Sequence, residues 1–167
     1  MLNRFAAFVG LLLLCAGCGG EAEKPEIPEV KIPDSFALAT EPAGAETPVQ
    51  LRASGKIGEA TVVGRVGGDR VVFVENRAVF TLVDPSLDPC HEDEGCPSPW
   101  DYCCNDPEDL KSKSVTVELH QDGKILKSSI QGFKGLDHLK TVVAVGHLKR
   151  DEAGNQVLIA TGLHVRP

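Results

Sequence analysis

Five short stretches rich in β-branched and other apolar residues limit this chain to a small β-rich fold. The clearest runs over 114–120, SVTVELH, where Val115, Val117 and Leu119 share one face. A period of two predicts a strand with one buried face. The sequence predicts further strands at 60–66, 77–83, 141–148 and 156–165, separated by turn sequences such as 122–123 and 151–155. The apolar patch 71–74 is expected either to extend the first hairpin or to fold over its end.

One unusual stretch, 84–109, interrupts this series between the second and third predicted strands. Its sequence is DPSLDPCHEDEGCPSPWDYCCNDPED, and we call it the insert. It holds four of the six cysteines, the only Trp, the only Tyr and nine carboxylates, with no Lys or Arg. A neutral connecting loop does not have this composition, so the insert is the first candidate for a functional element.

The order of the strand patterns suggests a small Greek-key barrel. The runs ATVVGRVGG, RAVFTLVD, SVTVELH, LDHLKTVVAVGHL and QVLIATGLHV resemble the OB-fold family. The resemblance implies an all-β fold, a five-stranded OB-like Greek-key barrel, over residues 51–167, with the Cys-rich insert 84–109 between strands 2 and 3. The alternatives are a β-sandwich or another small barrel.

The first residues are typical of an exported protein. Arg4 precedes an apolar stretch that is too short to remain as a membrane-spanning helix. Residues 1–17 resemble a bacterial lipoprotein signal, with Cys15, Ala16 and Gly17 before Cys18, although Cys15 stands where Leu is commonest. The resemblance implies that Cys18 becomes the lipidated terminus and attaches the chain to a membrane. Ordinary cleavage without lipid is the alternative.

This resemblance predicts a cell-envelope location that faces the periplasm. Gly19 and Gly20 follow Cys18 and give no acidic retention signal, which favours the outer membrane. Residues 18–50 are rich in Pro and Glu, and we expect an extended, mobile tether. A short helix is expected near its end, beginning at Thr47 and Pro48 and stopping at Gly55.

The cysteines of the insert favour disulfide bonds in an exported chain. Their spacing, C x5 C x6 CC, differs from the CxxC pairs of zinc ribbons and thioredoxin-like sites. Adjacent cysteines rarely bond to each other. We therefore expect Cys103 and Cys104 each to reach back, one to Cys90 and one to Cys96.

Two other interpretations of these cysteines stay open. Four thiolates, with His91 adjacent and Asp101 and residues 92–94 close by, are a donor set for zinc or copper. The adjacent pair, Cys103 and Cys104, argues against a single tetrahedral ion. The third interpretation is a reactive redox pair.

Two aromatic residues of the insert have a structural and a functional interpretation. Trp100 and Tyr102 lie in CPSPWDYCC, between prolines and the cysteine pair. As structural residues they would cap the sheet and cover the cysteines. As functional residues they would form an exposed contact for a partner.

The OB-fold resemblance also implies a ligand face on strands 2 and 3 and their neighbouring loops. In this chain that face would include Phe73 together with the basic residues Arg70, Arg77, Lys149 and Arg150. The barrel segments are basic overall, which suits polyanions. Nucleic acid is nevertheless an unexpected partner, because the chain is predicted to be exported, carries an acidic insert and offers one aromatic residue for stacking.

No catalytic motif is present, so no enzymatic activity is expected. The sequence therefore favours a lipid-anchored envelope interaction module, in which the insert contacts an envelope protein or polymer and no cofactor is required. The alternative is a metal-binding protein, for zinc or copper, or a thiol-redox protein that uses the four insert cysteines.

Overall fold

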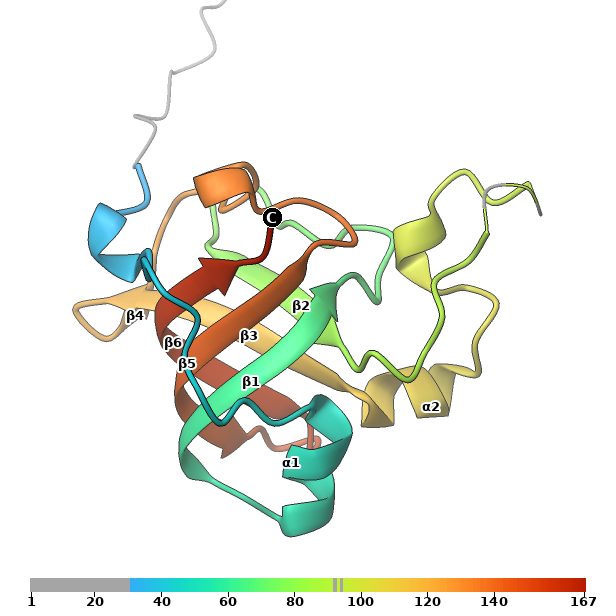
Figure 1. Cartoon of the computed structure of the whole chain (residues 1–167), viewed down its shortest axis with the longest axis horizontal. Helices are drawn as coiled ribbons and strands as arrows, with labels where there is room; N and C mark the ends of the chain where they lie inside the picture. The colour runs from blue at the N-terminus through green and yellow to red at the C-terminus, as the bar shows by residue number, and fades with distance from the viewer. Residues whose placement is uncertain (1–30, 92, 94) are drawn as a thin grey trace, which may run out of the picture.

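The computed structural model describes residues 31–91, 93 and 95–167, and it contains a closed β-barrel (Figure 1). The barrel strands are β1 (Gly58–Val66), β2 (Val79–Val83), β3 (Ser114–Gln121), β5 (Thr141–Arg150) and β6 (Gln156–Val165). They pair in the order β2-β1-β5-β6-β3, and a β2–β3 pairing closes the ring. All pairs are antiparallel except β3–β6, which is parallel.

This topology confirms the expected OB-like Greek-key barrel, and the insert lies between β2 and β3 as predicted. The alternating residues of β3 explain the closure, since Val115, Val117 and Leu119 are fully buried while their neighbours are not. Phe80 and Leu82 of β2 are buried in the same way. Each strand thus contributes one apolar face to a single core.

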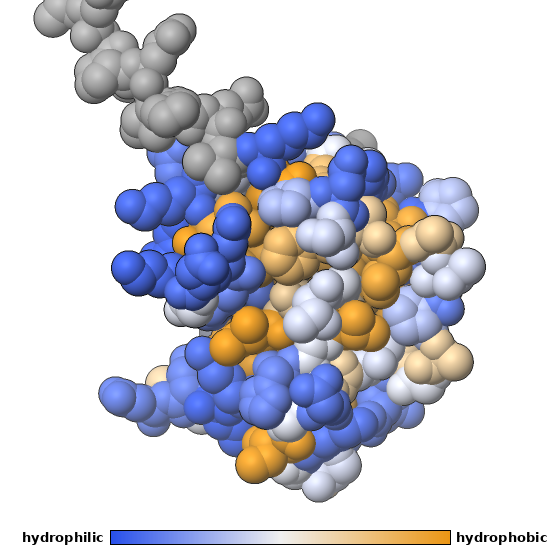
Figure 2. Space-filling model, turned by 90° about the vertical axis from the view of Figure 1, so that its left-hand side faces the viewer, coloured by the Kyte–Doolittle hydropathy of each residue, from blue (hydrophilic) through white to orange (hydrophobic). Residues whose placement is uncertain are grey.

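The remaining elements are short. They are η1 (Asp34–Phe36), α1 (Pro48–Ser54), η3 (Pro99–Asp101), α2 (Pro107–Ser112), β4 (Lys124–Ile125) and η4 (Phe133–Gly135). In the part of the chain that the structure describes, no helix has the length and apolar character needed to cross a bilayer. Figure 2 shows that apolar residues on one side of the molecule lie in small patches among hydrophilic ones.

Helix α1 begins and ends where the sequence predicts. Thr47 caps its N-terminus in a capping box with Gln50, and Pro48 occupies the first turn. Gly55 ends the helix in the left-handed conformation. Leu51 is fully buried and joins the barrel core, so α1 covers one end of the barrel (Figure 1).

The prediction of an extended, mobile tether is wrong for residues 31–50. Ile32 is buried in the core, and the backbone N–H of Leu38 donates to the carbonyl of Leu163 at 2.8 Å. Glu46 bonds to β1 through its backbone N–H and its carbonyl. These few apolar and backbone contacts attach a Pro- and Glu-rich stretch to the barrel. The expected signal 1–17, Cys18 and the rest of the tether lie outside the described residues.

The apolar patch 71–74 folds over the end of the barrel and forms no strand. Val72 and Phe73 are buried, whereas Val71 and Val74 are exposed. This patch therefore does not extend the first hairpin, and the alternative prediction, that it folds over the end, is confirmed.

One buried polar side chain in the barrel has no hydrogen-bond partner among the protein groups described. Gln156, at the start of β6, is 1% exposed, and neither its side-chain nitrogen nor its oxygen is paired. Burying an unpaired amide costs free energy. The substitution Gln156→Leu should therefore raise the free energy of unfolding by about 1–3 kcal/mol in urea titrations.

The matched control is Gln121→Leu, because Gln121 is exposed at the end of β3. This variant should stay within about 0.5 kcal/mol of the parent. A loss of stability in Gln156→Leu that exceeds the change in the control would contradict the assignment of an unsatisfied amide.

Candidate metal centre

The insert folds down against the barrel and does not stand away from it. The backbone N–H of Gly68, just after β1, donates to the carbonyl of Trp100 at 2.8 Å. A Cβ on Gly67 would lie 2.7 Å from both that carbonyl and the ring of Tyr102. Only glycine at position 67 permits this close approach, so the insert packs directly against the Gly67–Gly68 pair that follows β1.

Tyr102 is the centre of a second, smaller apolar cluster outside the barrel. Its side chain is fully buried beside Val83 and Leu87, and Leu110 and Leu139 pack against them. Its hydroxyl lies 3.5 Å from the guanidinium of Arg65. The interpretation of Tyr102 as an exposed contact is therefore wrong, and the structural interpretation is correct.

Trp100 is half-buried and also packs internally. Its ring stacks on His138 with centroids 4.2 Å apart, and Phe73 meets the same imidazole edge-on at 5.1 Å. The indole Nε1 donates to the carbonyl of Arg70 at 3.4 Å. Trp100 thus joins the insert to the β1–β2 and β4–β5 connections.

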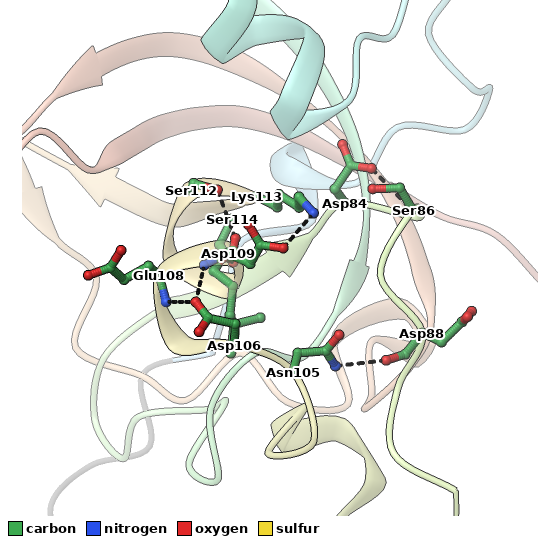
Figure 3. A network of polar contacts seen from close by, with 11 residues as sticks. Asp84, Ser86, Asp88, Asn105, Asp106, Glu108, Asp109, Ser112, Lys113 and Ser114 are labelled. Carbon is green, nitrogen blue, oxygen red and sulfur yellow. Dashed lines mark hydrogen bonds and ion pairs between the residues drawn. The ribbon is translucent and has the colours of Figure 1, made fainter.

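Carboxylates at both ends of the insert are used as local hydrogen-bond acceptors (Figure 3). Asp106 caps α2 by accepting from the N–H groups of Glu108 and Asp109 at 2.9 and 3.1 Å. Asp84 accepts from the N–H of Ser86 at 2.9 Å and from that of Val49 in α1 at 3.0 Å. The base of the insert is therefore tied to α1.

Asp84 is a buried carboxylate whose charge stabilises the fold. Burial alone would raise its pKa, but hydrogen bonds from the Thr47 side chain and from the N–H groups of Val49 and Ser86 outweigh burial and lower the pKa. A depressed folded-state pKa means that the stabilisation is complete above the ordinary carboxyl pKa of about 3.9. It is lost as the pH falls through the lower folded-state value.

Asp84→Asn should lower the free energy of unfolding by about 1–3 kcal/mol at pH 7, and the deficit should shrink below about pH 4. Urea titrations at both pH values measure this. Asp88→Asn is the control, since Asp88 is exposed and, among the residues that the structure describes, accepts a hydrogen bond only through its backbone carbonyl. Equal losses in the two variants, or a deficit independent of pH, would contradict the role of Asp84.

Three thiols and one carboxylate of the insert converge. The Sγ of Cys103 lies 3.4 Å from that of Cys90 and 3.7 Å from that of Cys96. A carboxylate oxygen of Asp101 completes the group, and all four donor atoms lie within 4.8 Å of one another. Cys90 is buried, Cys96 is half-buried and Cys103 is exposed, so the group lies at the surface with one buried side.

Local backbone geometry brings these residues together. The N–H of Cys90 donates to the carbonyl of Pro99 at 3.0 Å, which places Cys90 beside η3. Tyr102 adopts a left-handed conformation with φ of 57°, so the chain reverses between Asp101 and Cys103. This left-handed turn at Tyr102 directs the side chains of Asp101 and Cys103 toward Cys90.

Asp101 is oriented by two hydrogen bonds. Its Oδ2 accepts from the hydroxyl of Ser98 at 2.8 Å, and its Oδ1 accepts from the N–H of Cys103 at 2.9 Å. Burial would raise the pKa of Asp101, but these bonds outweigh burial and lower it. Ser98 was not predicted as part of the site, although the Ser-x-x-Asp spacing of Ser98 and Asp101 is a sequence signal for this hydrogen bond.

The thiols differ in acidity. Burial would raise the pKa of Cys90, but hydrogen bonds from the N–H of Cys104 and from the neighbouring thiols lower it. The pKa of Cys103 is raised far above its ordinary value, because its thiol is hydrogen-bonded to Cys90 and Asp101.

The expected disulfide pairing is not formed, and all four cysteines are free. Cys103 faces both Cys90 and Cys96 in this structure. Cys104 is exposed and contributes its backbone N–H to Cys90, not its thiol to the group. His91, an expected extra ligand, does not join the group either.

The basic residues expected on a ligand face do not gather in one place. Arg70 and Arg77 lie in the β1–β2 connection, whereas Lys149 and Arg150 end β5. The register of β1 with β5 puts these two pairs near opposite ends of the barrel. A hollow of about 240 Å³ lies between α2 and the outer face of β2 and β3, lined by residues that include Lys111, Thr81 and Thr116.

Comparison with known proteins identifies no family for this chain. No family model matches it, and no curated protein matches it significantly. Among solved structures, one similar chain is the second single-stranded DNA binding protein (SSBb) from Mycobacterium smegmatis, at 20% identity. The match covers 66% of this chain and 89% of that one, with a TM-score of 0.37. The fold assignment rests on the strand order, and no ligand is transferred from this likeness.

Proposed function

We propose that this chain is a lipid-anchored binding module of the cell envelope whose insert is built around one zinc ion. The observation that carries the proposal is the convergence of Cys90, Cys96, Cys103 and Asp101 within 4.8 Å. Three thiolates and one carboxylate supply the four ligands that zinc takes in structural sites.

The distances between the sulfur atoms support a shared ion. A tetrahedral ion with metal–sulfur bonds of about 2.3 Å separates its sulfur ligands by about 3.8 Å. The observed separations are 3.4 and 3.7 Å, whereas disulfide-bonded sulfur atoms are about 2.05 Å apart. The thiols thus need to move by only a few tenths of an ångström to bind zinc.

The fourth donor favours zinc over copper. Copper(I) prefers sets made only of soft sulfur donors, whereas zinc accepts a carboxylate beside thiolates. Asp101 is held in place by Ser98 and by the N–H of Cys103. The N–H of Cys104 donates to the Sγ of Cys90 at 3.3 Å, and such outer contacts orient the ligands of metal sites.

A bound ion would give shape to a segment that cannot build a large core. The insert carries nine carboxylates and no basic residue, and its own apolar cluster is small. An ion that links positions 90, 96, 101 and 103 would hold the tip of the insert as a rigid, acidic surface. In this proposal that surface, together with the exposed part of Trp100, contacts an envelope protein or polymer, and nucleic acid is not the ligand.

Zinc analysis of the detergent-solubilised full chain tests the metal site. The parent protein should carry about one zinc ion, and Cys103→Ser should lose at least about tenfold in zinc affinity because a ligand is removed. The matched control is its neighbour, Cys104→Ser, which should keep the zinc. The proposal fails if the parent chain binds no zinc, or if the two variants behave alike.

Membrane fractionation tests the anchor. Cys18→Ser should release the chain from the membrane fraction, because removal of the acylated cysteine removes the lipid that holds it there. Cys104→Ser should stay in the membrane fraction, since Cys104 lies far from the proposed signal and cleavage point. Retention of the Cys18→Ser protein in membranes would exclude lipid anchoring through this residue.

A further inference from the structure

We infer that the zinc site is redox-regulated: a peroxide links Cys90 to Cys103 as a disulfide and thereby releases the ion. This inference rests on the zinc site proposed above. The reacting thiols are those of Cys90 and Cys103, the oxidant is a peroxide, and the oxidised insert is held by a disulfide in place of zinc.

The geometry selects one pair of sulfur atoms. Cys103 is exposed and meets a dissolved oxidant first, whereas Cys90 is buried directly behind it. Their Sγ atoms are 3.4 Å apart, closer than the 3.7 Å between those of Cys103 and Cys96. The thiol of Cys104 lies outside the converging group.

The surroundings of Cys90 fit the second step of the reaction. Its sulfur accepts the N–H of Cys104 at 3.3 Å, which holds it in place 3.4 Å from the Sγ of Cys103. A thiolate is the form that attacks an oxidised sulfur atom. The buried cysteine therefore resolves the oxidised form of the exposed one.

The reaction balances in two steps. Cys103, which zinc binding requires in the deprotonated form, attacks one peroxide oxygen, the O–O bond breaks, and the products are a sulfenic acid on Cys103 and hydroxide. The Cys90 thiolate then attacks the Cys103 sulfur, the S–O bond breaks, and a disulfide and a second hydroxide form. Two electrons pass from the two sulfur atoms to the peroxide, and two protons convert the hydroxides to water.

Loss of two thiolates leaves the ion with only Cys96 and Asp101, so it departs. The loop between positions 90 and 103 nevertheless remains closed, because the new disulfide joins its ends. The insert is thus held by zinc when reduced and by a disulfide when oxidised. The crosslink within the insert changes from zinc to a disulfide, while the packing of the insert against Gly67 and Gly68 stays intact.

The test starts from the zinc-loaded full chain in detergent. Hydrogen peroxide is added in steps, released zinc is measured with a chromogenic chelator, and the remaining thiols are alkylated for peptide mass mapping. We expect one zinc ion released for each disulfide formed, with Cys90 joined to Cys103 and both Cys96 and Cys104 alkylated. A dithiol reductant should restore zinc binding.

Cys104→Ser is the matched control and should release zinc to the same extent through the same disulfide. Zinc that is retained after peroxide, or a disulfide that involves Cys96 or Cys104, overturns this inference and leaves the zinc site standing. A chain that holds no zinc before peroxide is added overturns the proposed site and this inference together.

Discussion

The burial of Tyr102 against Gly67 is the contact on which the candidate site depends. Tyr102 has no exposed surface, and its ring fills the space that a side chain at position 67 would need. Its left-handed backbone turns Asp101 and Cys103 toward Cys90. One apolar contact therefore both docks the insert on the barrel and arranges the donors of the proposed zinc site, which explains why a barrel can present a site that lies outside its own core.

The acidic character of the insert has a structural use beyond solubility. Asp84 ties the insert to α1, Asp106 caps α2, and Asp101 is held beside the thiols. Each of these carboxylates accepts backbone N–H groups, so mutual repulsion is offset locally by hydrogen bonds.

The barrel could be predicted from the sequence because its strands alternate cleanly, as in 114–120, and because Thr47 and Gly55 mark the ends of α1. The packing of residues 31–50 could not, since it depends on single contacts such as Leu38 against Gly162, which no periodic pattern reveals. The convergence of the thiols could not be predicted from the cysteine spacing either. The left-handed conformation of Tyr102 directs Cys103 toward Cys90 and Cys96, and a left-handed tyrosine has no sequence signature.

The central claim is that three sulfur atoms and one oxygen atom of the insert hold a zinc ion. X-ray absorption at the zinc edge of the full chain measures this donor set directly. The account predicts three sulfur neighbours at about 2.3 Å and one oxygen neighbour at about 2.0–2.2 Å. A shell of four sulfur atoms would show that Cys104 replaces Asp101, and a shell without sulfur would contradict the claim altogether.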